Sequence, residues 1–236
     1  MNYILKNNQI KNRGCVLVMA LLLTACAATV PPVRISETME PKKGEPSGLV
    51  FGTLGVSYPD GFFIEAEKLF FRKIGSKEYG SISYGATRDE RVVEDIKEIR
   101  SFYGRTFSVQ LPVGEYELFQ YWAHWHFAYG ITGHARANYS SNKEFSIPFK
   151  VEDGKATYLG TFTGYANMVG GKKSGLLVTY PASVYWVVSD NFDRDMGLLS
   201  SALQGEYKDS VVKAIVESHG VNAPFLPFCI SCSIGK

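Results

Sequence analysis

Residues 106–118, TFSVQLPVGEYEL, decide the expected fold. Over 106–111, apolar and polar side chains alternate, which is the period of two expected of a half-buried strand. Pro112 and Gly114 then provide the fixed and the permissive backbone torsions of a tight turn. The alternation resumes at Tyr116, so this stretch predicts two strands joined by a short turn.

Similar signals continue as far as residue 190. Residues 145–151 carry apolar side chains at every second position, and residues 155–162 return as a partner strand after Asp153-Gly154, a pair typical of hairpin turns. Aromatic residues make up 14% of the chain, which suits a core between two sheets. The sequence therefore predicts a mainly β fold over residues 48–190, a β-sandwich or an open barrel, of which the antiparallel β-sandwich is favoured.

Helical patterns occur in two regions. Thr87 and Glu90 have capping-box spacing and precede an apolar stripe, so a helix is expected over 87–100. Residues 191–236 are expected to form short helices and a tail packed on the sandwich, with Gly205 separating one helix from the next.

Asn191, Asp193 and Asp195 have the alternate spacing of a calcium loop. The glycine and glutamate that such a loop needs at later positions are replaced by Met196 and Ala202. The acidic side chains are therefore interpreted as caps of the helix that follows, where negative charge meets the helix dipole.

The first 26 residues have the composition of a secretion signal. Lys6, Lys11 and Arg13 give a positive start, and no acidic residue occurs before Glu37. The apolar run over 15–23 is too short to cross a bilayer core of about 30 Å at about 1.5 Å per residue. Its length suits the apolar region of a signal peptide.

The tetrapeptide LTAC that ends at Cys26 resembles the lipobox of bacterial lipoproteins. The resemblance implies a signal peptide over 1–25, cleavage before Cys26 and lipidation of its thiol; an ordinary secretory leader or an uncleaved anchor is the alternative. Several acyl chains on one residue anchor a protein stably to a membrane. Ala27 stands where an Asp would favour retention in the inner membrane, so the expected location is the outer membrane, with the chain facing the periplasm.

The segment 26–47 is interpreted as the lipidated cysteine followed by a proline-rich, semi-rigid tether. The whole chain has 25 basic and 23 acidic residues, but the leader holds three of the basic ones and none of the acidic ones. The mature chain would thus carry 22 basic and 23 acidic residues. This balance gives no electrostatic footprint for nucleic acid, which is excluded as a partner.

Residues 111–118, LPVGEYEL, together with 145–162, FSIPFKVEDGKATYLGTF, resemble a group of uncharacterised proteobacterial lipoproteins. Members of this group share a Leu-Pro-x-Gly-x-Tyr turn and a glycine-lysine hairpin, and they are similar in architecture to prealbumin-like or carboxypeptidase-regulatory-like sandwiches. The resemblance implies a small β-sandwich of the cell envelope and transfers no catalytic residue.

The aromatic stretch 121–134, YWAHWHFAYGITGH, is the richest source of candidate binding residues. Its exposed rings would form a ligand platform, for which the candidates are Tyr121, Trp122, Trp125 and Tyr129. Its imidazoles would be zinc or copper ligands, for which the candidates are His124, His126 and His134. No nearby Cys, Asp or Glu has the spacing of a further metal ligand, so the metal site would be incomplete. The favoured interpretation is a sandwich face with hydrogen-bonded histidines and no metal.

Cys229 and Cys232 remain as the thiols of the mature chain once Cys15 has left with the signal and Cys26 is lipidated. Only four residues follow Cys232, too few for the helix of a thioredoxin-like centre, and no second pair completes a zinc site. A local disulfide in the tail is the remaining interpretation, since an exported protein meets an oxidising compartment.

These observations favour a membrane-anchored lipoprotein that serves as a binding or structural module of the cell envelope. An envelope protein is the expected partner, and no cofactor is assigned. No catalytic residue is assigned either, since the chain has no Gly-x-Ser-x-Gly elbow to support nucleophilic catalysis. One alternative is a periplasmic hydrolase. A second is a metal-binding lipoprotein that uses the His-x-His pair of His124 and His126.

Overall fold

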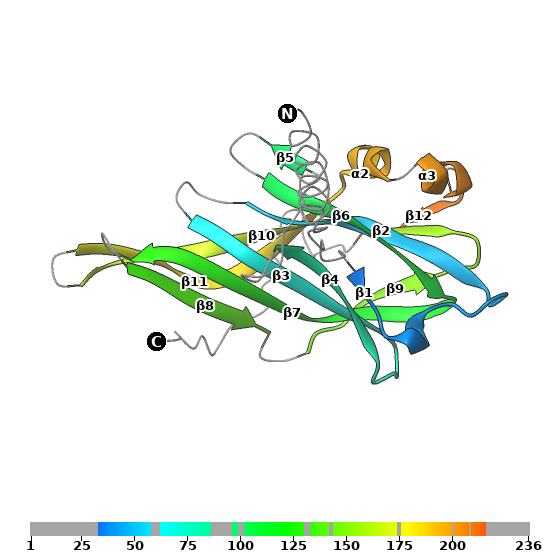
Figure 1. Cartoon of the computed structure of the whole chain (residues 1–236), viewed down its shortest axis with the longest axis horizontal. Coiled ribbons are helices and arrows are strands. Elements are labelled where there is room, and N and C mark those ends of the chain that lie inside the picture. The colour runs from blue at the N-terminus through cyan, green and yellow to red at the C-terminus, as the bar shows by residue number, and fades with distance from the viewer. Residues whose placement is uncertain are drawn as a thin grey trace, which may run out of the picture.

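The computed structural model describes residues 33–57, 62–85, 96–98, 102–129, 133–141, 144–173, 176–199, 201–207 and 209–215. Two sheets pack face to face, and two short helices lie on the outer side of one of them (Figure 1). The prediction of a mainly β sandwich with short C-terminal helices is therefore confirmed. None of the described helices is long and apolar enough to cross a membrane.

Sheet 1 is antiparallel throughout its described part and has the strand order β1-β4-β3-β7-β8, with β9 also paired to β7. Its strands are β1 (Val33–Arg34), β3 (Phe62–Lys73), β4 (Tyr79–Gly85), β7 (Gly114–Tyr129), β8 (Gly133–Ser140) and β9 (Ile147–Val151). A register shift where β3 pairs with β7 sets Phe70 opposite Gln120 and Phe71 opposite Leu118, so Phe119 is the extra residue of a bulge.

Sheet 2 has the order β11-β10-β2-β6-β5, with β12 also paired to β10. Its strands are β2 (Ser47–Val56), β5 (Ile96–Glu98), β6 (Phe102–Pro112), β10 (Ala156–Lys173), β11 (Leu176–Ser189) and β12 (Val211–Lys213). The pairs β10–β2 and β10–β12 are parallel, and the other pairs are antiparallel. The sheet is therefore mixed. Its β10 runs parallel to β2, a strand from a much earlier part of the chain.

The predicted turn at Pro112 and Gly114 forms and joins β6 of sheet 2 to β7 of sheet 1. The hydroxyl of Tyr116 donates a hydrogen bond to the carbonyl oxygen of Pro112 (2.9 Å), and its ring stacks on Phe149 with centroids 5.6 Å apart. This bond back to the preceding chain resembles the tyrosine corner of other sandwiches. Burial, with a smaller contribution from the charge of Glu45, raises the pKa of Tyr116 to about 12.

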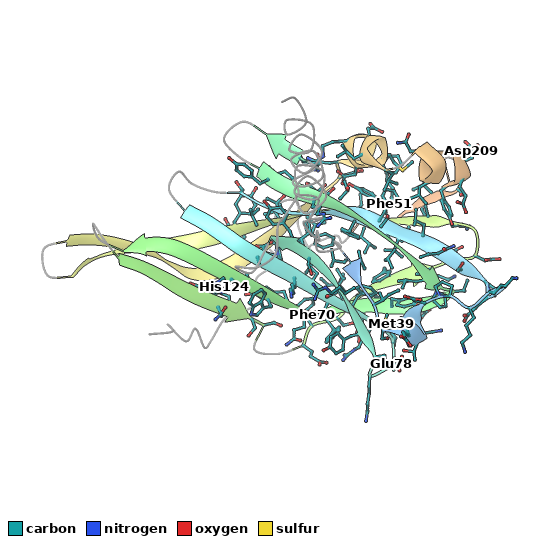
Figure 2. The ribbon with its side chains drawn as sticks, in the orientation of Figure 1. Met39, Phe51, Phe70, Glu78, His124 and Asp209 are labelled. Atoms are coloured by element: carbon teal, nitrogen blue, oxygen red, sulfur yellow. The ribbon has the colours of Figure 1, made fainter. Side chains whose placement is uncertain are left out.

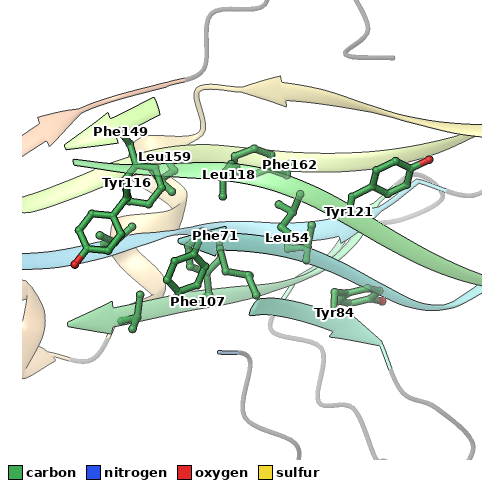
Figure 3. Packing of buried hydrophobic residues seen from close by; sticks show 14 of the residues in the cluster. Leu54, Phe71, Tyr84, Phe107, Tyr116, Leu118, Tyr121, Phe149, Leu159 and Phe162 are labelled. Atoms are coloured by element: carbon green, nitrogen blue, oxygen red, sulfur yellow. The ribbon is translucent and has the colours of Figure 1, made fainter. Parts of the chain in front are cut away.

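The core lies between the two sheets, where alternate residues of each strand face inward (Figure 3). Leu54 and Phe107 of sheet 2 meet Phe71 and Leu118 of sheet 1, and all four are at most 1% exposed. Each such side chain stabilises the fold by about 1.5–3 kcal/mol through removal of apolar surface from water. The alternation recognised at 106–111 is thus the alternation of core and surface.

The turn at Asp153-Gly154 forms, but it does not close the predicted hairpin. Gly154 has a φ of 64°, the left-handed conformation that glycine adopts without strain, and the backbone N–H of Ser47 donates to Asp153 Oδ1. However, β9 pairs with β7 in sheet 1, whereas β10 pairs with strands of sheet 2. The turn therefore carries the chain from one sheet to the other.

The helices α2 (Phe192–Leu198) and α3 (Ser201–Tyr207) cover the outer face of sheet 2. Apolar residues of both helices pack against β2 and β10, and the cluster comprises Leu49, Phe51, Ala156, Tyr158, Phe192, Met196, Leu199, Leu203 and Tyr207 among others. The predicted break at Gly205 was wrong. Gly205 lies inside α3, and the two helices are separated after Leu198.

Two predicted helical stretches contain strand instead. Ile96–Glu98, within the expected helix 87–100, pairs with β6, and Ile96 is buried; the rest of that helix lies outside the described residues. Val211–Lys213, within the expected second C-terminal helix, pairs with β10. In both places an open sheet edge supplies backbone hydrogen bonds that the local helical pattern does not reveal.

The expected tether over 26–47 is folded from Val33 onward, so its second half was misinterpreted. Val33 and Arg34 pair with β4, and the 3-10 helix Glu37–Met39 places Met39 in the main core. The sandwich therefore includes residues before the expected start at Gly48 and, through β12, residues after its expected end at 190. Proline spacing indicated an extended segment, but tertiary contacts of the apolar residues between the prolines fix it.

A substitution at Met39 tests whether the segment that follows Val33 is part of the folded sandwich. Replacing Met39, which is 6% exposed, with alanine is expected to lower the free energy of unfolding by about 2 kcal/mol, because a buried methionine is truncated. The neighbouring exposed residue Glu40 provides the control Glu40→Ala, which is expected to change stability by less than about 0.5 kcal/mol. Equal unfolding curves for the two variants in urea would show that the segment is a free tether.

Candidate functional site

The outer face of sheet 1 carries an array of aromatic and cationic side chains, which we call the aromatic face. Alternation along β3 sends Leu69 and Phe71 into the core and leaves Phe70 half-buried on the opposite side. The residues of the aromatic face are Lys68, Phe70 and Arg72 of β3, Tyr79 of β4, and Phe119, Trp122 and His124 of β7. The helices α2 and α3 cover sheet 2, on the other side of the molecule.

Three rings from three adjacent strands form the first half of the aromatic face. The centroid of Tyr79 lies 5.9 Å from that of Phe70 and 6.2 Å from that of Phe119, and Tyr79 is 55% exposed. Phe119 reaches this side because it occupies the bulge of β7. Edge-to-face contacts of this kind hold rings in fixed orientations, so they present a preformed apolar surface.

The side chain of Arg72 lies over a ring of the same cluster. Its guanidinium carbon lies 4.2 Å from the ring centroid of Phe119, a cation–π contact. Its Nε donates to Glu117 Oε1 (2.8 Å), and one of its terminal nitrogens donates to Glu144 Oε2 (2.7 Å). Hydrogen bonds to Ser146 and then Arg72 lower the pKa of Glu117 below its ordinary value. The cation is therefore held in place beside the rings.

The second half of the aromatic face is centred on Trp122. The imidazole of His124 stacks on it with centroids 5.9 Å apart and an interplanar angle of 14°, and Lys68 Nζ lies 5.6 Å from the Trp122 ring. His124 Nδ1 is 2.6 Å from Asn138 Oδ1, so this nitrogen carries the proton and donates. Figure 2 shows Phe70 and His124 on the sheet 1 side of the molecule, far from Asp209.

An open hollow of about 520 Å³ adjoins the aromatic face where β1 meets β4. Tyr79 belongs to both features. The hollow is lined by Arg34, Ile35, Ser36, Lys77, Glu78, Tyr79, Gly80 and Ser81. Glu78 accepts a hydrogen bond from the hydroxyl of Thr38, so the lining combines two cations, one engaged carboxylate and several hydroxyl groups.

The structure places Tyr121 and Trp122, two residues of the predicted ligand platform, on opposite faces of sheet 1. Tyr121 is fully buried and packs its ring on Trp186 at 4.4 Å, so it belongs to the core and was wrongly placed in the platform. Trp122 lies half-buried on the outer face, as a platform residue would. The side chains of Trp125 and Tyr129 lie outside the described part of the structure.

The predicted metal ligands are not brought together in the described part of the chain. His124 is bonded to Asn138, and the described residues contain no group of three potential metal ligands. The side chains of His126 and His134 lie outside those residues, as do Cys26, Cys229 and Cys232. The lipidation site and the disulfide therefore stay predictions.

Two carboxyl groups are buried where the sequence patterns did not predict burial. Glu67 lies between the sheets and Asp195 lies beneath α2, and both are 0% exposed. Glu67 shares its strand parity with Leu69 and Phe71, so the alternation of β3 contained the signal for its burial. Asp195 was interpreted as a helix cap; instead Asp190 Oδ1 accepts the first helical N–H, from Phe192.

Asp195 fastens α2 to sheet 2. Its Oδ2 accepts hydrogen bonds from the hydroxyls of Tyr158 and Thr161, each 2.8 Å long, and its Oδ1 lies 2.9 Å from Arg194 Nε. Arg194 also donates to Thr161 Oγ1 (2.9 Å), and the backbone N–H of Asn191 donates to Tyr158. Burial is the main cause that raises the pKa of Tyr158 above its ordinary value. The network is structural, because helix and sheet enclose it.

Comparisons with known proteins do not assign this chain to a family. No protein-family model, curated protein or solved structure matches the chain.

Proposed function

We propose that the chain is a lipid-anchored, non-enzymatic binding module of the cell envelope, attached to the outer membrane on its periplasmic side. The leader and its lipobox-like tetrapeptide support the anchor. The observation that supports binding is the aromatic face, where Phe70, Tyr79 and Phe119 form a partly exposed cluster with a fixed cation beside it. Tyrosine and arginine are among the side chains enriched at positions that contribute most to the free energy of protein–protein binding.

Site-specific crosslinking in cells tests the binding proposal. A photo-crosslinking amino acid at Tyr79 is expected to capture an envelope protein, and the same group at Asp209, exposed on the opposite side of the molecule, is expected not to do so. Substituting Phe70→Ser is expected to abolish capture at Tyr79 while the protein remains folded. Equal capture at both positions, or capture that survives Phe70→Ser, would contradict a specific site on this face.

The anchor is tested separately by feeding cells a labelled fatty acid. The wild-type protein is expected to incorporate the label and to sediment with outer membranes, whereas Cys26→Ser is expected to lose both properties. Label retained by Cys26→Ser would contradict lipidation at this residue. The binding result does not depend on this outcome, because crosslinking at Tyr79 reports contact with a partner.

A further inference from the structure

Glu67 occupies an unusual position for a carboxyl group. It lies on the inner side of β3, is 0% exposed, and faces sheet 2. Its Oε2 accepts a long hydrogen bond from Trp186 Nε1 (3.3 Å) on β11, and its Oε1 has no hydrogen-bond partner among the described residues. The carboxyl group fits because Gly164 of β10 stands opposite, where any Cβ would collide with it.

The described residues around Glu67 supply no compensating charge. Its cross-strand neighbours are Tyr84 on β4 and Ala123 on β7, and Tyr121 packs on the Trp186 ring. From sheet 2 it faces Gly164 and Trp186. Among the described residues no cation contributes to its pKa, which burial raises to about 8 and the Trp186 bond offsets in part. At neutral pH the group is therefore a neutral acid.

An ionised Glu67 would need water around it, but in the described part of the sandwich its side chain is 0% exposed. A cavity lined in part by Trp186 has a volume of about 10 Å³, and its other lining residues are apolar, including Leu69 and Phe162. A cavity of that size is at the lower limit for one water molecule, and a water needs polar partners. A bare carboxylate is far too costly to bury without either water or a counter-ion.

We propose that Glu67 is a proton-operated latch between the two sheets. While its O–H bond is intact, Glu67, Trp186 and Gly164 stay packed and the sandwich is closed. When hydroxide or another base takes the proton, the remaining carboxylate draws in water, and β3 separates from β10 and β11. The lost proton leaves to solvent, so the step is a reversible ionisation coupled to opening.

The detergent-solubilised full chain, labelled with ¹⁵N in its tryptophan indoles, tests the latch. The Trp186 Nε1–H signal is expected to move reversibly with a midpoint near pH 8. Over the same range, hydrogen-exchange protection of β3 and β10 amides, corrected for the intrinsic pH dependence of exchange, is expected to fall at least tenfold. Glu67→Gln keeps a carbonyl for the indole and removes the ionisation, so both changes are expected to vanish.

Three results would overturn the latch. They are a Trp186 signal that does not titrate between pH 6 and 10, an identical titration in Glu67→Gln, and a titration during which amide protection stays constant. A measurement on the wild type alone covers the case in which the variant does not fold. The ¹³C shift of the Glu67 side-chain carboxyl must report a protonated group at pH 6.5 and an ionised one above pH 9, and an ionised group at pH 6.5 would also exclude the proposal.

Discussion

Replacing Asp195 with alanine is expected to lower the free energy of unfolding by about 3–4 kcal/mol. The substitution removes the acceptor of the Tyr158 and Thr161 hydroxyls and the partner of the Arg194 guanidinium, all at the junction of α2 and sheet 2. The Tyr158 and Thr161 hydroxyls would then lose the acceptor of their protons, and Arg194 would lose a carboxylate partner that is 0% exposed. Removing one member of such a charged pair costs more than the pair contributes.

Asp193 provides a matched control for this experiment. It lies in the same turn of α2 but is exposed, so Asp193→Ala is expected to change stability by less than about 0.5 kcal/mol. Urea unfolding followed by circular dichroism measures both variants. If Asp195→Ala proved as stable as Asp193→Ala, the network beneath α2 would contribute nothing, and the helix would be held by its apolar face alone.

Glu67→Gln is expected to stabilise the protein at pH 7 by up to about 3 kcal/mol. Burial raises the pKa of Glu67 from its ordinary value of 4.5 to about 8, so the native state holds a proton that the unfolded chain releases. The unfolded state binds fewer protons throughout this window, and stability therefore falls as pH rises from about 4.5 to about 8. Glutamine does not titrate and escapes this loss.

The difference between the two proteins is expected to depend on pH. Below the ordinary pKa of 4.5 their unfolding free energies should converge, because Glu67 is then protonated in both states of the wild type. The gap should widen up to about pH 8 and then level off. Denaturant unfolding at a series of pH values measures it, and a gap independent of pH would show that Glu67 ionises normally in the folded protein.

Alternation made the sandwich predictable, because a strand with one face in the core carries its period in its own sequence. Residues 106–111 and their continuation at Tyr116 are such strands. The strands at Ile96–Glu98 and Val211–Lys213 were not predictable in this way. Each is three residues long and forms because a sheet edge is available, which is information held elsewhere in the chain.

The candidate site was harder to predict than the fold. Trp122 was identified from an aromatic-rich stretch, but its neighbour Tyr121 faces the core, and composition alone does not distinguish the two sides of a strand. Phe119 reaches the aromatic face because of a bulge, which local sequence does not mark. Tyr79 joins it from a strand 40 residues earlier, so the cluster exists through the order of strands in sheet 1.

The parallel pairing of β2 with β10 also determines when the protein can fold. The register partners Leu49 and Ala156 are 107 residues apart, and β10 is flanked on its other side by strands that come still later in the chain. Contacts of such long sequence separation slow folding to roughly milliseconds to seconds. A chain emerging from its N-terminal end during synthesis would stay without a closed sandwich until residues beyond 156 arrive. It would therefore remain open to chaperones and proteases for longer than a protein built from local hairpins.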